Sequence, residues 1–133
     1  MIRTVIRPLI RSLNPAADVR SSAEITIDLS GIQIRQRITG EWTGKPVVIW
    51  RRSPGAIAAA RAAALDEDHN AKEVDGLLIK IGICPHSGCV PFGQEGVNVG
   101  EFGGWFCPCH GSRYDTSGRI QKGPAPGNLD VPP

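Results

Sequence analysis

Apolar and polar positions alternate along the first part of this chain in the way that is typical of short β-strands. Every second residue is apolar over residues 25–29 (ITIDL), and a second alternating run extends over residues 32–42. Residues 47–50 (VVIW) form a continuous, largely β-branched run, as in a buried strand, and residues 44–45 indicate the turn into it. The sequence therefore predicts three strands before residue 52.

The remaining pattern predicts one helix and two further strands. Residues 54–65 (PGAIAAARAAAL) favour a helix, because alanine has the highest helix propensity and proline suits the first turn. Residues 66–75 are mostly charged, which indicates an exposed loop with His69 as a solvated side chain rather than a ligand. Strands are predicted over residues 77–83 and 102–106, and each leads directly into a cysteine.

Composition and chain length narrow the class of protein. At 133 residues the chain is best explained as one small domain, whose limited core benefits from a covalent or metal link. Lys and Arg exceed Asp and Glu by only 15 to 13, so the charge favours neither nucleic acid nor an electrostatic membrane partner. No run of 18 apolar residues is present, and we expect the chain as given to be soluble. Residues 1–23 are predicted to be an N-terminal arm followed by a hinge-like linker.

All four cysteines lie in two short motifs, and each motif also contains a histidine. The first motif is Cys84-Pro-His86-Ser-Gly-Cys89, and the second begins Cys107-Pro-Cys109-His110. Brought together, Cys84, His86, Cys107 and His110 would supply two thiolates and two imidazoles, the ligand set of a Rieske [2Fe-2S] centre. Zinc bound by the same four residues is the less favoured alternative, because zinc fingers place their histidines on a helix and need no additional cysteines.

The two remaining cysteines are candidates for a disulfide bond. A bond between Cys89 and Cys109 would lock the two motifs together, so we predict this disulfide and, with it, an oxidising compartment. The alternative is a tetrathiolate centre in which all four cysteines are ligands, but it would leave both histidines idle beside the metal. The turn at residues 117–118 and the loop over residues 123–126 (GPAP) follow the second motif.

Two hydroxyl groups follow His110 closely enough to influence such a centre. A donor to a sulfur that gains negative charge on reduction stabilises the reduced form, so Ser112 and Tyr114 are predicted to raise the reduction potential. The alternative is that Tyr114 is simply a buried aromatic residue and Ser112 a turn residue.

Taken together, the motifs CPHSGC, GGWFCPCHGSRYD and GPAP resemble the Rieske iron–sulfur subunit of the cytochrome bc complex (ubiquinol–cytochrome c reductase), and the resemblance covers almost the whole chain. It implies a mainly β fold: an antiparallel β-sandwich with a small cluster-binding subdomain and one helix–loop insert. The implied Rieske domain covers residues 24–133, with the cluster-binding subdomain at about 82–126.

The resemblance also implies a role for each site residue. Cys84 and Cys107 would bind the buried iron, while His86 and His110 would bind the exposed iron and form the catalytic edge. Ser112 and Tyr114 would donate hydrogen bonds to a bridging sulfide and a ligand sulfur. The residues that would cover the cluster are Gly123, Pro124, Ala125 and Pro126.

The function implied by the resemblance is that of the catalytic iron–sulfur subunit of a quinol-oxidising complex, the chain alone being an electron carrier. It would accept an electron, and a proton through a ligand histidine, from ubiquinol and pass the electron to cytochrome c1, with cytochrome b and cytochrome c1 as partner subunits. The domain would lie on the periplasmic or mitochondrial intermembrane-space side of a membrane, anchored by a helix that is not in this sequence. The alternative is a soluble Rieske ferredoxin that serves an oxygenase, although such ferredoxins generally lack the additional cysteine pair.

The chain departs from the family pattern within the first motif. Pro85 and Ser87 stand where the family usually has Thr and Leu. That Leu contributes to the apolar collar that docks at the quinol site, so Ser87 is expected to weaken docking or shield the cluster less. The family's final strand, expected after the Pro-rich loop, would lie beyond Pro133.

Overall fold

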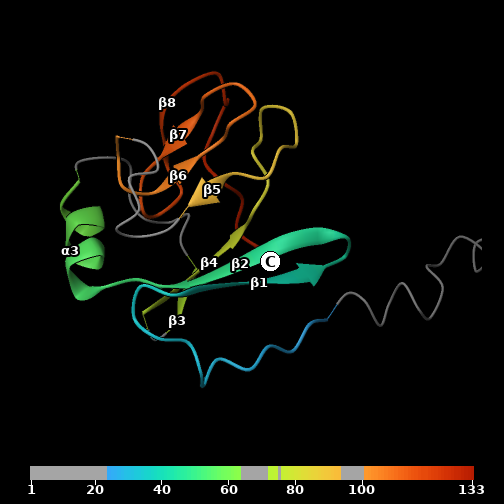
Figure 1. Cartoon of the computed structure of the whole chain (residues 1–133), viewed down its shortest axis with the longest axis vertical. Coiled ribbons are helices and arrows are strands. Elements are labelled where there is room, and N and C mark those ends of the chain that lie inside the picture. The colour runs from blue at the N-terminus through green and yellow to red at the C-terminus, as the bar shows by residue number, and fades with distance from the viewer. Residues whose placement is uncertain (1–23, 64–71, 75, 94–100) are drawn as a thin grey trace, which may run out of the picture.

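The computed structural model describes residues 24–63, 72–74, 76–93 and 101–133, which form two small antiparallel sheets and one helix (Figure 1). The first sheet has the strand order β1-β2-β4-β3 and the second has the order β5-β6-β7-β8. The elements are β1 (Arg37–Trp42), β2 (Lys45–Arg51), α3 (Pro54–Ala62), β3 (Lys72–Val74), β4 (Leu77–Ile81), β5 (Phe92–Gly93), β6 (Trp105–Phe106), β7 (Arg113–Tyr114) and β8 (Ile120–Lys122). The prediction of a mainly β, antiparallel fold with one helix is confirmed.

Strand β2 is the centre of the molecule because both of its faces are covered. Val48 and Trp50 point toward the second sheet, where the ring of Trp50 meets that of Trp105 edge to face with centroids 5.7 Å apart. Val47 and Ile49 point the other way and join a second apolar cluster. This two-sided burial explains why residues 47–50 form an unbroken apolar run.

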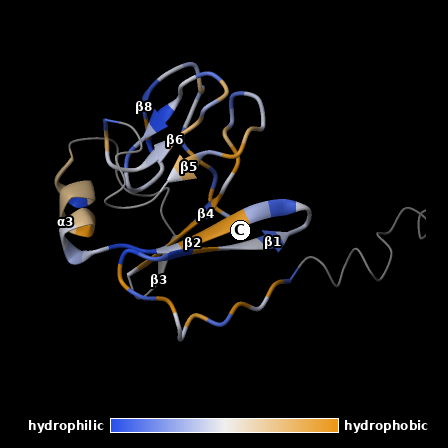
Figure 2. Cartoon of the chain, viewed as in Figure 1, coloured by the Kyte–Doolittle hydropathy of each residue, from blue (hydrophilic) through white to orange (hydrophobic). Residues whose placement is uncertain are grey.

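The segment before β1 contradicts the prediction of a strand over residues 25–29, and the run predicted over residues 32–42 is a strand only from Arg37 to Trp42. No strand lies between residues 24 and 36; the backbone instead turns at Ser30, whose N–H donates to the Asp28 carboxylate (2.9 Å), and again before Arg35, which has a φ of 71°. The alternation of apolar residues is nevertheless real (Figure 2), since Ile27 and Leu29 pack on the outer face of the first sheet. Two strands, not three, therefore precede residue 52 in the described part of the chain.

The hairpin between β1 and β2 closes one residue earlier than predicted. Trp42 and Lys45 are paired, and the two residues between them, Thr43 and Gly44, have φ values of 48° and 75°. Two successive left-handed residues are typical of the turns that match the twist of a two-residue hairpin.

Part of the predicted charged loop is a strand. Lys72–Val74 pairs antiparallel with Leu77–Ile79 of β4, so the expectation of an exposed loop over residues 66–75 is wrong for this stretch. Its charged sequence carries no apolar alternation, and the backbone pairing with β4 decides its conformation. His69 lies outside the described residues.

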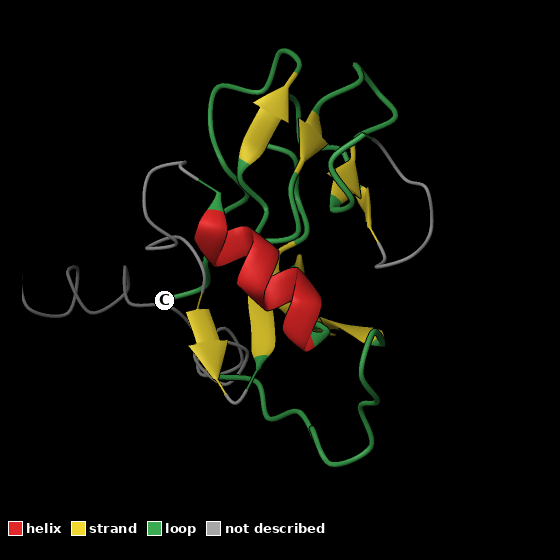
Figure 3. Cartoon of the chain, turned by 90° about the vertical axis from the view of Figure 1, so that its left-hand side faces the viewer, coloured by secondary structure: helices red, strands yellow, loops and turns green. Residues whose placement is uncertain are grey.

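Helix α3 lies between β2 and β3 in the chain and covers one side of the molecule, the side that faces the viewer in Figure 3. Ser53 caps its N-terminus by accepting a hydrogen bond from the N–H of Ala56 (3.2 Å), and Pro54 occupies the first turn. The helix ends at Ala62, earlier than the predicted residue 65. No helix in the described residues is long and apolar enough to cross a membrane.

The second sheet is built from strands of only two or three residues, and the C-terminal segment returns to the first sheet. The predicted strands over residues 77–83 and 102–106 are present but shorter, as Leu77–Ile81 and Trp105–Phe106. The N–H of Ile81 donates to the carbonyl of Asp130 (2.8 Å), which fixes the chain after the Pro-rich loop beside β4. The C-terminal segment therefore links the second sheet back to β4 of the first sheet.

Candidate metal centre

The two cysteine–histidine motifs fold into loops with the same backbone pattern. In the first loop the N–H of Cys84 donates to the carbonyl of Cys89 (2.8 Å), and the N–H of Gly88 donates to the carbonyl of Cys84 (3.0 Å). In the second loop Cys107 pairs in the same way with Ser112 (2.8 Å) and Gly111 (3.0 Å).

Gly88 and Gly111 occupy the fifth position of each loop with φ values of 81° and 79°, a conformation that glycine adopts without strain. The loops differ in where the imidazole stands: His86 is the third residue of its loop and His110 the fourth. The repeated backbone therefore presents one thiol and one imidazole from each loop.

A disulfide joins the two loops. Sγ of Cys89 is bonded to Sγ of Cys109, with the Cα atoms 6.6 Å apart. The predicted disulfide is thus confirmed, and the tetrathiolate alternative is wrong, because a disulfide sulfur is not available as a thiolate ligand. Cys84 and Cys107 remain as free thiols.

These two thiols are buried and interact with each other. Burial by itself raises the pKa of Cys84, but the hydrogen bond from Tyr114 and further hydrogen bonds from His86, Cys107 and Ser112 lower the pKa below its usual value. Burial raises the pKa of Cys107, and the neighbouring Cys84 raises it further. Of the two thiols, Cys84 is the one that the Tyr114 hydroxyl contacts, at 3.0 Å.

The two imidazoles are exposed and converge. Nδ1 of His86 lies 3.2 Å from Nδ1 of His110, and the rings meet at 86°. Two ring nitrogens that point at one place, beside two free buried thiols, are a donor set of two sulfurs and two nitrogens. This set fits the Cys2His2 ligation of a Rieske [2Fe-2S] cluster.

The Pro-rich loop packs on Ser112. The Ser112 hydroxyl oxygen accepts a hydrogen bond from the N–H of Ala125 (3.1 Å), which leaves the hydroxyl hydrogen for another acceptor. Gly123 has a φ of 115°, and a Cβ there would lie 2.5 Å from Cα of Ser112. The structure therefore brings Gly123 and Ala125 to the second motif, while Pro124 and Pro126 are exposed.

Ser87 lies where the two loops meet. Its hydroxyl oxygen is 3.4 Å from Nδ1 of His110 and 3.9 Å from Sγ of Cys89, and the residue is exposed. Pro85, the other departure from the family pattern, is half-buried. The serine thus presents a small polar group at the exposed edge of the site.

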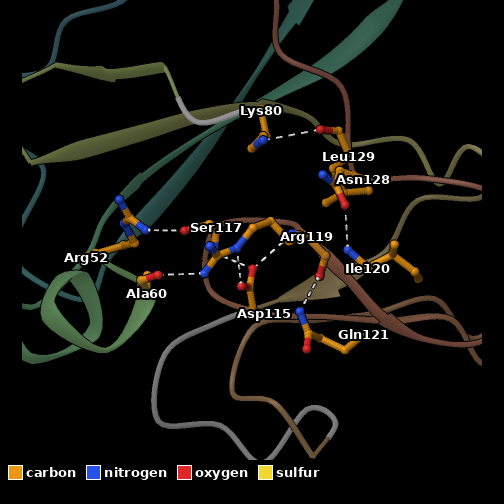
Figure 4. Close-up of polar contacts among 10 residues, drawn as sticks. All are labelled: Arg52, Ala60, Lys80, Asp115, Ser117, Arg119, Ile120, Gln121, Asn128 and Leu129. Atoms are coloured by element: carbon orange, nitrogen blue, oxygen red, sulfur yellow. Dashed lines mark hydrogen bonds and ion pairs between the residues drawn. The ribbon is translucent and has the colours of Figure 1, made fainter. Parts of the chain in front are cut away.

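Sequence reasoning missed a network of buried and partly buried polar side chains around the turn that follows β7 (Figure 4). Its charged members are Arg52, Lys80, Asp115 and Arg119, which sequence alone would place at the surface. The available signal was the run Asp115-Thr-Ser117-Gly-Arg119, since the carboxylate of an Asp commonly closes a turn by accepting the backbone N–H two residues further on.

The fold and the site together define a Rieske-type iron–sulfur protein. Residues 26–133 match the model of the Rieske [2Fe-2S] domain family. The chain is 52% identical over 134 residues to the ubiquinol–cytochrome c reductase iron–sulfur subunit of Rickettsia conorii, covering 95% of this chain and 73% of that protein. It is 43% identical over 149 residues to the subunit of the same name from Rhodobacter capsulatus, covering 94% and 76%.

A solved structure gives the same result. A chain of a structure described as a hyperthermophilic respiratory complex III aligns with 98% of this chain and 82% of its own length, at a TM-score of 0.63 and 27% identity. This chain belongs to the family of Rieske iron–sulfur subunits of the cytochrome bc complex. Its cofactor is the Rieske [2Fe-2S] cluster, and it is an electron-transfer subunit of that complex.

Proposed function

We propose that this chain accepts one electron from ubiquinol and delivers it to cytochrome c1, with a proton leaving ubiquinol through His86 or His110. Cys84 and Cys107 would hold the buried iron, and the two histidines the exposed iron. The observation that carries the proposal is the contrast between the free, buried thiols and the exposed imidazoles whose Nδ1 atoms converge at 3.2 Å. This arrangement insulates one side of the cofactor and leaves its ligand rings accessible to a substrate.

The exposed imidazoles support the proposed uptake of a proton. When Nδ1 of a ring binds the metal, Nε2 on the far side of the ring is the nitrogen left to bind a proton. The bound cluster supplies a one-electron acceptor whose charge alters how strongly Nε2 holds that proton. Ubiquinol is a two-electron donor, so the second electron has to leave through another centre of the complex.

We infer the partner subunits and the location from the relatives and from the disulfide. The curated relatives are named as subunits of ubiquinol–cytochrome c reductase, which supports cytochrome b and cytochrome c1 subunits as partners. Membrane association follows from membership of the complex. The Cys89–Cys109 disulfide supports the periplasmic or intermembrane-space side, because disulfides persist in oxidising compartments. We further propose that residues 82–126 act as the cluster-binding subdomain.

Potentiometry against pH tests the electron-transfer role. Rieske clusters span about −150 to +300 mV, and a quinol-linked centre is expected in the positive part of that range with a midpoint that falls at alkaline pH. A midpoint well below zero would favour the alternative function, a soluble Rieske ferredoxin.

The ligand assignment has a separate test. His86→Ala and Cys107→Ser are expected to abolish the cluster, seen as loss of the visible absorption and of the Rieske-type EPR signal. Ser87→Ala changes an exposed neighbour of the same ligands and is expected to keep both signals. A His86→Ala variant that retains the Rieske signal would refute the assignment.

A further inference from the structure

Arg119 connects the turn after β7 to helix α3 through a buried fork of hydrogen bonds (Figure 4). Its Nε donates to the Asp115 carboxylate at 2.6 Å, and its Nη2 donates to the carbonyl oxygen of Ala60 at 2.7 Å. The side chain is almost fully buried, with 3% of the residue exposed. One planar guanidinium thus fixes the turn and the helix relative to each other, which a lysine ammonium could not do with the same geometry.

The turn itself has little freedom. The second oxygen of the Asp115 carboxylate accepts the N–H groups of Ser117 and Arg119, each at 2.9 Å. The N–H of Gly118 donates to the carbonyl of Asp115 (3.0 Å), and the N–H of Asp115 donates to that of Arg119 (3.0 Å). Any displacement of Arg119 is therefore passed directly to the backbone of Asp115.

The position of Asp115 also limits the position of Tyr114, the residue before it. Its backbone packs against Gly104 so closely that a Cβ on Gly104 would overlap the Asp115 carbonyl. Tyr114 pairs with Trp105 in the adjacent strand, and its hydroxyl lies 3.0 Å from Sγ of Cys84. The hydrogen bonds that hold Asp115 therefore act one peptide bond away from Tyr114, which carries this hydroxyl.

We propose that Arg119 is a positioning residue for the redox centre, which holds the Tyr114 hydroxyl at Sγ of Cys84 by anchoring Asp115 to helix α3. This inference rests on the proposed role of Cys84 as a ligand. Hydrogen-bond strength falls steeply with distance and angle, so loosening the anchor weakens the bond that stabilises the more negative, reduced centre. Loss of Arg119 thereby lowers the reduction potential although Arg119 does not touch the ligands.

A double-mutant cycle on the full chain separates this role from that of a structural brace. The variants are Arg119→Lys, Tyr114→Phe and the two combined. Arg113→Lys is the matched control, because it also keeps the charge, and Arg113 lies beside Tyr114 on β7 but forms its ion pair with Glu101 (2.8 Å). The measurements are the midpoint potential, the EPR signal and the denaturant midpoint.

Arg119→Lys is expected to retain the EPR signal and to lower the potential by part of the Tyr114→Phe shift. In the Tyr114→Phe background, Arg119→Lys should change the potential no more than Arg113→Lys does. If Arg119→Lys lowers the denaturant midpoint but leaves the potential unchanged, or if its shift is undiminished without the hydroxyl, Arg119 is only a brace and the proposal is wrong.

A second variant provides the test if the Arg119→Lys protein does not accumulate. Asp115→Glu keeps the charge that pairs with Arg119, but its longer side chain cannot accept the N–H groups of Ser117 and Arg119 with the same geometry, and it is expected to lower the potential in the same direction. Retention of the cluster in Cys84→Ser would overturn the ligand assignment, whereas an unshifted potential in a loaded Arg119→Lys protein overturns only the role of Arg119.

Discussion

The hydroxyl oxygen of Tyr114 lies 3.0 Å from Sγ of Cys84, in the buried part of the centre. Burial, together with the thiol, raises the pKa of Tyr114 well above its usual value, so the hydroxyl keeps its proton and acts as a donor across the working pH range. If Cys84 binds the cluster as proposed, a permanent donor at its sulfur stabilises whichever redox state carries more negative charge there.

Tyr114→Phe removes only this donor and is expected to lower the reduction potential with the cluster retained. A hydrogen bond to a charged group contributes roughly 1.5–3 kcal/mol, and only the difference between the two redox states counts. The expected shift is therefore on the order of tens of millivolts for a one-electron couple. Potentiometry followed by visible absorption measures it, and a midpoint equal to that of the parent would contradict the role.

Removing the disulfide is expected to destabilise the domain and shorten the lifetime of the cluster. Cys89 and Cys109 are separated by 20 residues, and closing a loop of this length stabilises a fold by roughly 3 kcal/mol. The double variant Cys89→Ser/Cys109→Ser avoids a new free thiol. Denaturant unfolding should show the lower stability, and bleaching of the visible absorption should be faster. If neither changes, the disulfide does not hold the loops together.

Gly123 provides a test of the Pro-rich loop. A Cβ at this position would lie 2.5 Å from Cα of Ser112, and the φ of 115° is unfavourable for any side chain. Gly123→Ala is therefore expected to cost about 1–3 kcal/mol and to displace Ser112, which should alter the midpoint potential as well as the denaturant midpoint.

Gly127→Ala is the matched control for that change, because nothing lies within 4 Å of its Cβ position. It should leave stability within about 0.5 kcal/mol of the parent. Equal effects of the two substitutions would show that the packing of the loop on Ser112 is unimportant.

The sequence predicted the fold best where burial is two-sided or the motif is chemical. Residues 47–50 were identifiable because a strand covered on both faces is apolar throughout, whereas the alternation over residues 25–29 reported side-chain burial without backbone pairing. Strands β5, β7 and β8 have two or three residues each, which is too short for any periodicity to be recognised. Their pairing is decided by the loops that they connect.

For the site, the spacing of cysteines and histidines was sufficient to predict the disulfide, because each motif had one cysteine left over. No comparable motif predicts the polar network around the turn that follows β7. Arg119 and Lys80 are buried in the structure, but their residue types are nearly always exposed, and only the folded chain brings the carbonyls of Ala60 and Leu129 to them. The contacts of Arg119 and Lys80 with these carbonyls are thus long-range and leave no local pattern, unlike the turn that Asp115 closes.

A contact between two buried tryptophan rings joins the two sheets. Trp50 of β2 and Trp105 of β6 are both fully buried and meet edge to face, and Trp105 also pairs with Tyr114 and stands two residues before Cys107. Replacing a buried tryptophan by alanine removes its apolar area and leaves a cavity, at a cost of about 3–5 kcal/mol. Trp50→Ala should therefore lower the free energy of unfolding by this amount and, because Trp105 loses its support, shorten the lifetime of the cluster.

Trp42→Ala is the comparison, since Trp42 is only partly buried and packs on the opposite face of the same sheet. It should cost less stability than Trp50→Ala and leave the cluster lifetime near that of the parent. Unfolding followed by far-UV circular dichroism avoids the loss of a fluorophore, and Trp50→Phe retains a smaller ring if the alanine variant does not accumulate. Equal cluster lifetimes in Trp50→Phe, Trp42→Ala and the parent would show that the site is held by its own loops and not by the packing of one sheet on the other.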